Sequence, residues 1–161
     1  AHRDGWPPRG PRTHRAYHGH GGRRVYGTVS LTACDASPCV LITYRKSGTA
    51  VASPVWFRFH DGGFEVVIAQ SDVKLRRLQH RRDCSLLIFE ATPPFRGVRV
   101  EGTPTLVPDH HHESRMAIAG RYLGRERAQT FVEQRREPGV VLRMSAEHAR
   151  TWDLNAILPT A

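Results

Sequence analysis

The sequence predicts a mainly β or α+β fold, a small antiparallel barrel of about six strands with flanking helices. Short β-branched runs alternate apolar and polar residues, and Gly- or Pro-containing turns separate them. The pattern changes to a helical period after Gln70 and again after Asp109. The alternation favours antiparallel strands, because the buried strands of a parallel α/β sheet read as continuous apolar runs.

The first three strands are expected to follow one another as an antiparallel meander. Residues 39–45 (CVLITYR) and 49–59 (TAVASPVWFRF) flank the turn KSG and form a hairpin. The turn at 60–63 (HDGG), with two glycines, leads into 64–69 (FEVVIA). Pro54 cannot donate a backbone hydrogen bond, which predicts an edge or a bulge for the second strand.

A short helix is expected at residues 71–82 (SDVKLRRLQHRR). Ser71 is a suitable N-cap, and Asp72 complements the positive end of the helix. The apolar contacts of this helix are expected from Val73, Leu75 and Leu78.

Three further strands are expected at residues 85–91, 96–107 and 140–154, the last with a bend near 145–148. A helix capped by Asp109 and ended by Gly124 lies between the last two strands, and a second helix follows at roughly 125–136. The apolar residues of the first of these helices are Met116, Ile118, Ala119, Tyr122 and Leu123. The histidine run at 110–112 is interpreted as a solvated helix start and not as a metal site, because adjacent side chains point in different directions.

The length of 161 residues favours one domain, which we place at 25–161. Residues 1–24 have no hydrophobic period and are expected to form a disordered or loosely attached arm, with nucleic-acid binding as the alternative role. The arm lacks the apolar segment of a secretory signal, and no apolar run approaches the roughly 20 residues of a membrane span. We therefore expect a cytoplasmic protein with no membrane partner.

The charge of +9 predicts attraction to anions. Only two of the 24 basic residues are lysines, Lys46 and Lys74, and the excess of arginine is typical of GC-rich coding. Against that background Lys74 is the informative basic residue. Cys34, Cys39 and Cys84 are too few for a disulfide framework or a zinc site and are expected to be reduced thiols.

The start of the 71–82 helix predicts a seat for an anion. A helix N-terminus presents unpaired N–H groups and a positive dipole end, and Lys74 is close enough to reach back to it. Arg77 lies on a neighbouring row of the same helix. The residues alone leave a second interpretation open, a capped amphipathic helix whose charges are solvated.

Three segments resemble the pyridoxamine 5'-phosphate oxidase-like flavin and deazaflavin oxidoreductases, most closely the class that uses coenzyme F420. They are LITYRKSGTAVASPVWF, SDVKLRRLQHRRDCSLLIFE and PPFRGVRVEGT, in the family's order, and the resemblance covers about 39–154. It implies a split β-barrel homodimer whose cofactor ring lies between the two subunits. It also implies that the phosphate is bound by Lys74 with Arg77 in support, at a junction formed by Gln70 and Ser71.

Other cofactor-binding residues are implied by the same resemblance. The strand under the ring matches Ser53, Pro54, Val55 and Trp56. The loop that the second subunit brings to the cofactor matches Phe95, Arg96 and Gly97, and Trp152 matches an aromatic residue on the last strand.

The function that this resemblance implies is that of an F420-dependent reductase, which transfers hydride between the deazaflavin and an unsaturated small-molecule substrate. An FMN-binding oxidoreductase of the same fold, or a non-catalytic flavin- or F420-binding protein, is the alternative. No catalytic acid or base is assigned, because the ring itself exchanges the hydride. Nucleic-acid binding is not expected, since the sequence lacks exposed aromatic residues interleaved with basic ones.

Overall fold

The computed structural model describes residue 37, residues 39–135 and residues 137–158. The predicted arm at 1–24, the start of the predicted domain and Cys34 lie outside these residues. None of the described helices is long and apolar enough to cross a membrane.

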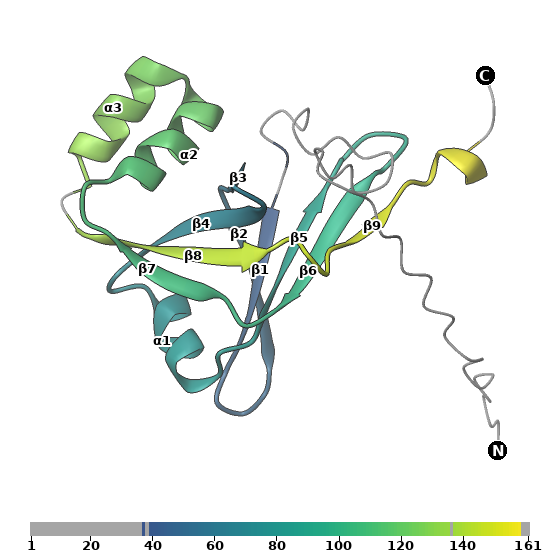
Figure 1. The fold of residues 1–161 in the computed structure, drawn as a ribbon, viewed down its shortest axis with the longest axis horizontal. Helices are drawn as coiled ribbons and strands as arrows, with labels where there is room; N and C mark the ends of the chain where they lie inside the picture. Colours follow the sequence, from purple (N-terminus) through teal and green to yellow (C-terminus); the bar gives the residue numbers. More distant parts are fainter. Residues whose placement is uncertain (1–36, 38, 136, 159–161) are drawn as a thin grey trace.

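Within the described residues the chain forms two antiparallel sheets (Figure 1). The five-stranded sheet has the order β2 (Ala50–Val55), β1 (Cys39–Tyr44), β5 (Cys84–Phe89), β6 (Gly97–Gly102), β9 (Arg150–Trp152). The four-stranded sheet has the order β3 (Arg58–His60), β4 (Gly63–Ala69), β8 (Gly139–Ser145), β7 (Thr105–Asp109). No strand pair among the described residues joins the two sheets, so the barrel is split and not closed.

The predicted mainly β fold with antiparallel strands and flanking helices is confirmed, but three of the predicted strands are each divided in two. The run 49–59 breaks at Trp56 and Phe57 into β2 and β3, and the run 96–107 breaks after Gly102 into β6 and β7. The last run breaks at its predicted bend into β8 and β9. At each break the chain passes from one sheet to the other, which alternation alone does not reveal.

Both turns of the predicted meander form antiparallel pairs, but the two pairs, β1–β2 and β3–β4, belong to different sheets and do not make one continuous meander. The β1–β2 hairpin forms as expected, with Leu41 opposite Ser53. The next long strand, β4, pairs with β3 and β8 in the other sheet. The position of Pro54 is confirmed, because β2 is an edge strand.

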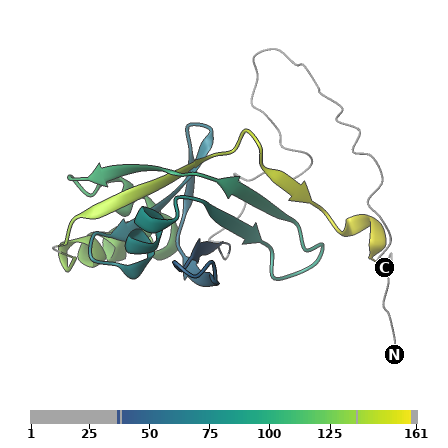
Figure 2. The same ribbon diagram turned by 90° about the horizontal axis from the view of Figure 1, so that it is seen from below.

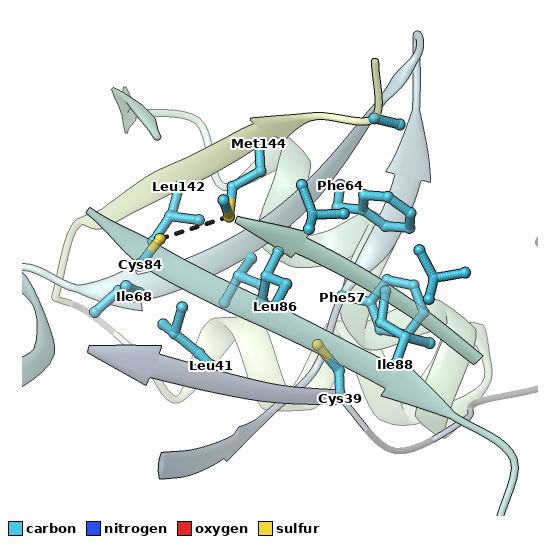
Figure 3. Packing of buried hydrophobic residues seen from close by; sticks show 14 of the residues in the cluster. Cys39, Leu41, Phe57, Phe64, Ile68, Cys84, Leu86, Ile88, Leu142 and Met144 are labelled. Atoms are coloured by element: carbon cyan, nitrogen blue, oxygen red, sulfur yellow. Dashed lines mark hydrogen bonds between the residues drawn. The ribbon is translucent and has the colours of Figure 1, made fainter. Parts of the chain in front are cut away.

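The core lies between the two sheets (Figure 3). Leu41, Leu86 and Ile88 from the five-stranded sheet face Phe64 and Leu142 from the four-stranded sheet, and all are fully buried or nearly so. The Cys84 thiol lies 3.5 Å from the Met144 sulfur within this core. Cys39 and Cys84 are free and buried, as predicted, and burial raises the pKa of each thiol to about 12.

Three helices cover the sheets: α1 (Val73–His80), α2 (Glu113–Leu123) and α3 (Arg125–Glu133); a short 3₁₀ helix, Asn155–Ile157, follows β9. Helix α1 packs on β1 and β4, and α2 packs on α3 and β4. Gly124 ends α2, as predicted. In Figures 1 and 2 the α1 and α2–α3 helices gather where β4 ends and β8 begins.

The predicted N-cap of α1 is corrected by one residue. Asp72, not Ser71, caps this helix, because the Asp72 carboxylate accepts the Lys74 backbone N–H at 2.8 Å. Leu75 and Leu78 are buried as expected, whereas Val73 is exposed because it lies on the outer side of the first turn.

Candidate functional site

A cavity of about 230 Å³ opens at the end of the molecule where β4, β8 and the helices meet. We call it the first cavity. One wall comes from the end of β2 and from β4, another from the start of α1, and a third from α2 and α3. Its lining is Pro54, Val55, Trp56, Val67, Ile68, Ala69, Asp72, Lys74, Arg115, Ile118, Phe131 and Arg135.

A second cavity, of about 570 Å³, continues the first along the edge of β2. The two cavities share five lining residues, namely Pro54, Val55, Trp56, Phe131 and Arg135. The rest of the second cavity is lined by Ser37, Cys39, Val40 and Tyr122. Together they form a groove whose one end is cationic and whose other end is mostly apolar.

The β2 side of the groove offers backbone groups as well as side chains. An edge strand leaves a row of N–H and C=O groups without a partner strand. Among the residues that the structure describes β2 is such an edge, so its outward backbone groups near Val55 can hydrogen-bond the polar edge of a planar ligand.

Aromatic side chains stiffen the same wall. The Trp56 ring, 37% exposed, stacks on Tyr122 with centroids 5.1 Å apart and an interplanar angle of 9°. Phe131 packs against Trp56 at 5.2 Å in a tilted arrangement. The Tyr122 hydroxyl accepts the Phe57 N–H and donates to the Ser37 carbonyl, both at 3.3 Å. Burial raises the pKa of Tyr122, so its phenol stays neutral at physiological pH.

The start of α1 brings Lys74 into the first cavity. The Lys74 ammonium donates to the Asp72 carboxylate at 2.7 Å, and the same carboxylate takes the Lys74 backbone N–H. Burial acts to raise the pKa of Asp72, but the hydrogen bonds from Lys74 and the charges of Lys74 and Arg77 outweigh it and leave the pKa below its ordinary value. The Asp72 carboxylate therefore already binds the Lys74 ammonium and one N–H group at this helix start, and an anionic ligand would compete with it.

Arg115 adds a buried cation to the opposite wall. Its guanidinium donates through Nη1 to the carbonyls of Arg135 (3.3 Å) and Glu137 (2.8 Å) and contacts the His112 Nδ1 at 3.2 Å. The Asp109 carboxylate accepts the Arg115 backbone N–H at 3.0 Å and the Ser114 N–H at 3.3 Å. The Asp109 side chain thus satisfies two N–H groups in the first turn of α2, but it lies four residues before Glu113, which begins the helix, and the residue at the N-cap position is His112.

Gly139, at the start of β8, leaves the space in which Arg115 lies. A Cβ atom at this position would lie 2.7 Å from Val67 Cγ1 and 3.0 Å from Arg115 Nη2. Any larger residue here would push the guanidinium or the wall of the cavity.

The predicted site residues separate into three groups. Pro54, Val55, Trp56 and Lys74 come together in the first cavity. Ser53, Gln70, Ser71 and Arg77 lie beside the cavity but outside its lining; Gln70 donates its N–H to the Pro138 carbonyl at 3.1 Å, and Ser71 donates its N–H to the Glu137 carboxylate at 2.5 Å.

Phe95 and Arg96 form the third group, in the loop between β5 and β6. The Arg96 guanidinium pairs with Glu90 at 2.6 Å within that loop, and Phe95 is exposed. The β5–β6 hairpin reaches away from α1 (Figures 1 and 2), so one chain does not bring this loop to its own cavity. Trp152 lies on β9 with its indole over Gly97, where a Cβ atom would lie 2.0 Å from the ring.

The sequence reasoning missed the wall that α2 and α3 supply, above all Arg115 and Arg135. A signal was available for one of them. Arg115, Ile118, Ala119 and Tyr122 are spaced as one face of a helix, so an arginine begins an otherwise apolar stripe. An arginine on a buried helix face requires partners in the fold or in a ligand.

Comparison with known proteins places this geometry in a family. The family model described as pyridoxamine 5'-phosphate oxidase matches residues 32–153. A search of curated proteins found no match.

Among solved structures, a conserved hypothetical protein from Mycobacterium tuberculosis is 24% identical with a TM-score of 0.64, over 78% of this chain and 82% of that one. An F420 reductase is 19% identical with a TM-score of 0.55, over 71% and 90%. The heme storage protein HutZ from Vibrio cholerae is 14% identical with a TM-score of 0.54, over 72% and 86%. At these identities the structures establish a shared fold.

Proposed function

The chain belongs to the pyridoxamine 5'-phosphate oxidase family, and from that premise we propose that it is an F420-dependent reductase that works as a homodimer. The reaction is hydride transfer between the deazaflavin and an unsaturated small molecule. The coarser part of the proposal is that the chain binds a flavin-type cofactor, and FMN in place of F420 is its alternative.

The observation that carries the proposal is the placement of Lys74 in one groove with the edge of β2. The cationic end, with Lys74, Arg115 and Arg135, suits the phosphate that both candidate cofactors carry. The edge of β2 at Pro54, Val55 and Trp56 suits a planar ring with a polar rim. The residues present therefore fit a phosphorylated, ring-bearing ligand.

When bound, the cofactor ring supplies the hydride chemistry. The chain's own task is to bind, orient and exclude water. Lys74 draws the phosphate to the start of α1, and the β2 edge fixes the ring plane. The stacked Trp56 and Tyr122 and the adjoining Phe131 form a stiff apolar wall that keeps water from the reacting face. The Tyr122 hydroxyl holds two backbone groups, which makes it a positioning group and not an acid or base.

The homodimer is supported by the position of the β5–β6 loop. In one chain the β5–β6 hairpin that carries Phe95 and Arg96 runs away from α1, yet the family resemblance assigns that loop to a cofactor site (Figures 1 and 2). A second copy of the chain would bring them there. The Arg96–Glu90 ion pair orders the loop for such a contact.

The structures with similar folds bind different cofactors, so the choice of F420 over FMN is the finer part of the proposal. One similar structure is an F420 reductase, and another is a FAD-binding protein from Mesorhizobium loti, 17% identical with a TM-score of 0.51. F420 is preferred because the groove and the chain are strongly cationic, with a net charge of +9, and the tail of F420 carries carboxylates beyond its phosphate.

The test is a fluorescence titration of the full chain with F420 and with FMN. We expect tighter binding of F420, and a loss of about 1.5 to 3 kcal/mol in the Lys74→Ala variant, since a charge-assisted hydrogen bond to the phosphate is lost. Lys46→Ala is the matched control, because Lys46 is the other lysine of the chain and lies in the exposed turn between β1 and β2.

Equal affinity of the Lys74→Ala and wild-type proteins would remove Lys74 from the phosphate site. Tighter binding of FMN would select the alternative cofactor, and binding of neither would contradict the proposal. Enzymatic activity is then measured as oxidation of the reduced cofactor by conjugated enones, and light scattering on the eluting protein measures whether it is a dimer.

A further inference from the structure

Arg115 is a buried cation that makes no close ion pair in the described part of the chain, although the charges of Asp109 and Glu137 act on it from a greater distance. The residue is 6% exposed and lies in the first turn of α2, on the wall of the first cavity. No ion pair of the described residues includes it. Burial nevertheless outweighs these two carboxylates and lowers the pKa of Arg115, so its charge is only partly compensated within the described residues.

The hydrogen bonds of Arg115 use only part of its donors. All three of its side-chain contacts run through Nη1, to the carbonyls of Arg135 and Glu137 and to the His112 ring. Among the described residues neither Nε nor Nη2 has a hydrogen-bond partner, and neither is sealed from solvent. The guanidinium is thus anchored at one nitrogen and has donors left for a ligand in the cavity.

The charges around the first cavity also favour an anion. Three cationic side chains, Lys74, Arg115 and Arg135, line it, against one carboxylate, that of Asp72. Asp72 is already engaged with Lys74, and the Asp109 carboxylate is engaged with two backbone N–H groups of α2. Burial lowers the pKa of Arg115, but a guanidinium remains protonated in proteins.

We propose that Arg115 binds the phosphate of the cofactor from the α2 side of the first cavity, opposite Lys74. The phosphate seat then spans two helices that are distant in sequence, and the planar guanidinium supplies the directional hydrogen bonds that an ammonium does not. This inference rests on the proposed function, since it assigns a second residue to the same cofactor site.

The competing role for Arg115 is purely structural, as a link between α2 and the segment that leads into β8. Two variants separate the roles. Arg115→Gln keeps an N–H donor for the carbonyls but removes the charge. Arg115→Lys keeps the charge but loses the planar set of donors. A structural role moves the unfolding temperature alone, whereas a phosphate-binding role moves the preference for phosphorylated over unphosphorylated ligands.

The experiment titrates the full chain with FMN and riboflavin, and with F420 and its deazaflavin chromophore without the phosphate. In the wild type we expect the phosphorylated member of each pair to bind more tightly. We expect Arg115→Gln to weaken the phosphorylated ligand by about ten-fold or more and the unphosphorylated one by less than about two-fold, because only the phosphate contact is lost. Arg115→Lys should fall between Arg115→Gln and wild type.

The matched control is Arg99→Gln, which removes an arginine from β6 that pairs with Glu101 and lies outside both cavities. Its ligand affinities should equal those of the wild type, which excludes a simple effect of net charge. If Arg115→Gln does not fold, Arg115→Lys decides the question by the same comparison, the affinity for the phosphorylated ligand relative to that for the unphosphorylated one.

If both variants fold and prefer the phosphorylated ligands as strongly as the wild type does, the assignment of Arg115 is overturned and the proposed function stands. If the wild type binds none of the four ligands, the proposed function fails and this inference fails with it. A preference that Lys74→Ala reduces and Arg115→Gln does not would assign the seat to α1 alone.

Discussion

Two groups of charged residues in this protein differ in whether their arginines form ion pairs with carboxylates. In the first, Arg58, Glu65 and Arg143 lie in one row across β3, β4 and β8. The Glu65 carboxylate, on a residue that is 5% exposed, accepts from Arg58 Nε at 2.6 Å and from Arg143 Nη1 at 2.9 Å. Arg143 also pairs with Asp61, so two cations meet two carboxylates within one sheet.

The charged residues around the first cavity include fewer carboxylates than cations. Lys74, Arg115 and Arg135 share a cavity with the single carboxylate of Asp72, and Arg115 is held by carbonyl oxygens. The first group satisfies its own charges and has no need of a ligand. The second leaves positive charge and hydrogen-bond donors directed at a hollow, which is what an anion-binding site requires. The partners of an arginine, and not its burial alone, separate a structural role from a binding one.

The largest effect is expected in the self-matched group. Glu65→Gln leaves two arginines facing a neutral amide, and we expect the free energy of unfolding to fall by about 3 kcal/mol. Urea denaturation followed by circular dichroism measures it. Asp61→Asn is the control, since Asp61 is 84% exposed on its side chain and its pair should contribute less than about 1 kcal/mol.

The contrast predicts that ligand affinity stays unchanged in Glu65→Gln once the protein is folded. A loss of cofactor affinity as large as that in Lys74→Ala would contradict the separation of the two groups. A change in unfolding free energy no larger than that of Asp61→Asn would show that the Glu65 row does not stabilise the fold.

A smaller effect is expected where β8 passes the cavity wall. Gly139→Ala places a methyl group against Val67 and Arg115, and overpacking of this kind costs roughly 1 to 3 kcal/mol. Because the methyl group also displaces the guanidinium, affinity for FMN or F420 should fall along with stability. Thermal unfolding and fluorescence titration measure the two effects.

Gly120→Ala is the matched control, since this glycine lies within α2 with no atom near its added Cβ. It should stabilise the helix by up to about 1 kcal/mol, the opposite sign. Destabilisation by both substitutions would trace the effect to the helices and not to the space beside Arg115.

Local patterns in the sequence predict the helices, the approximate positions of the strands, and the β2 and α1 walls of the candidate site. The β1–β2 hairpin, the edge position of Pro54 and the Gly124 stop follow from turn chemistry and the missing N–H of proline, which act over a few residues. The breaks that divide three strands depend on which sheet the chain joins next, and this is decided by long-range packing.

The same limit explains the site. Lys74 could be predicted from the sequence because a helix start has a local sequence signal. Arg115 lies about 40 residues further along the chain, and only the fold brings it to the same cavity. The N-cap was misplaced by one residue because Ser71 and Asp72 are both residue types that cap helices, and in the structure the Asp72 carboxylate accepts the Lys74 N–H. A second subunit at Phe95 and Arg96 stays a prediction.

The smallest effect is expected at Asp72, the one carboxylate in the cavity. Asp72→Asn keeps a side-chain oxygen to cap α1 but removes the negative charge beside Lys74. We expect FMN or F420 to bind roughly two- to five-fold more tightly, because the ligand phosphate no longer competes with a neighbouring acid for the ammonium. Fluorescence titration at low ionic strength, where screening is weakest, resolves a change of this size.

The same variant has a pH signature that a change of shape would not produce. The folded-state pKa of Asp72 lies below its ordinary value, so its charge stabilises the fold above that value, and the contribution is lost as the pH falls through the folded-state pKa. Wild type should therefore be the more stable protein near neutrality, and the difference from Asp72→Asn should begin to shrink below about pH 4 and vanish only below the folded-state pKa of Asp72. Weaker ligand binding by Asp72→Asn, or a stability difference that persists in acid, would mean that this carboxylate organises the seat and does not compete for it.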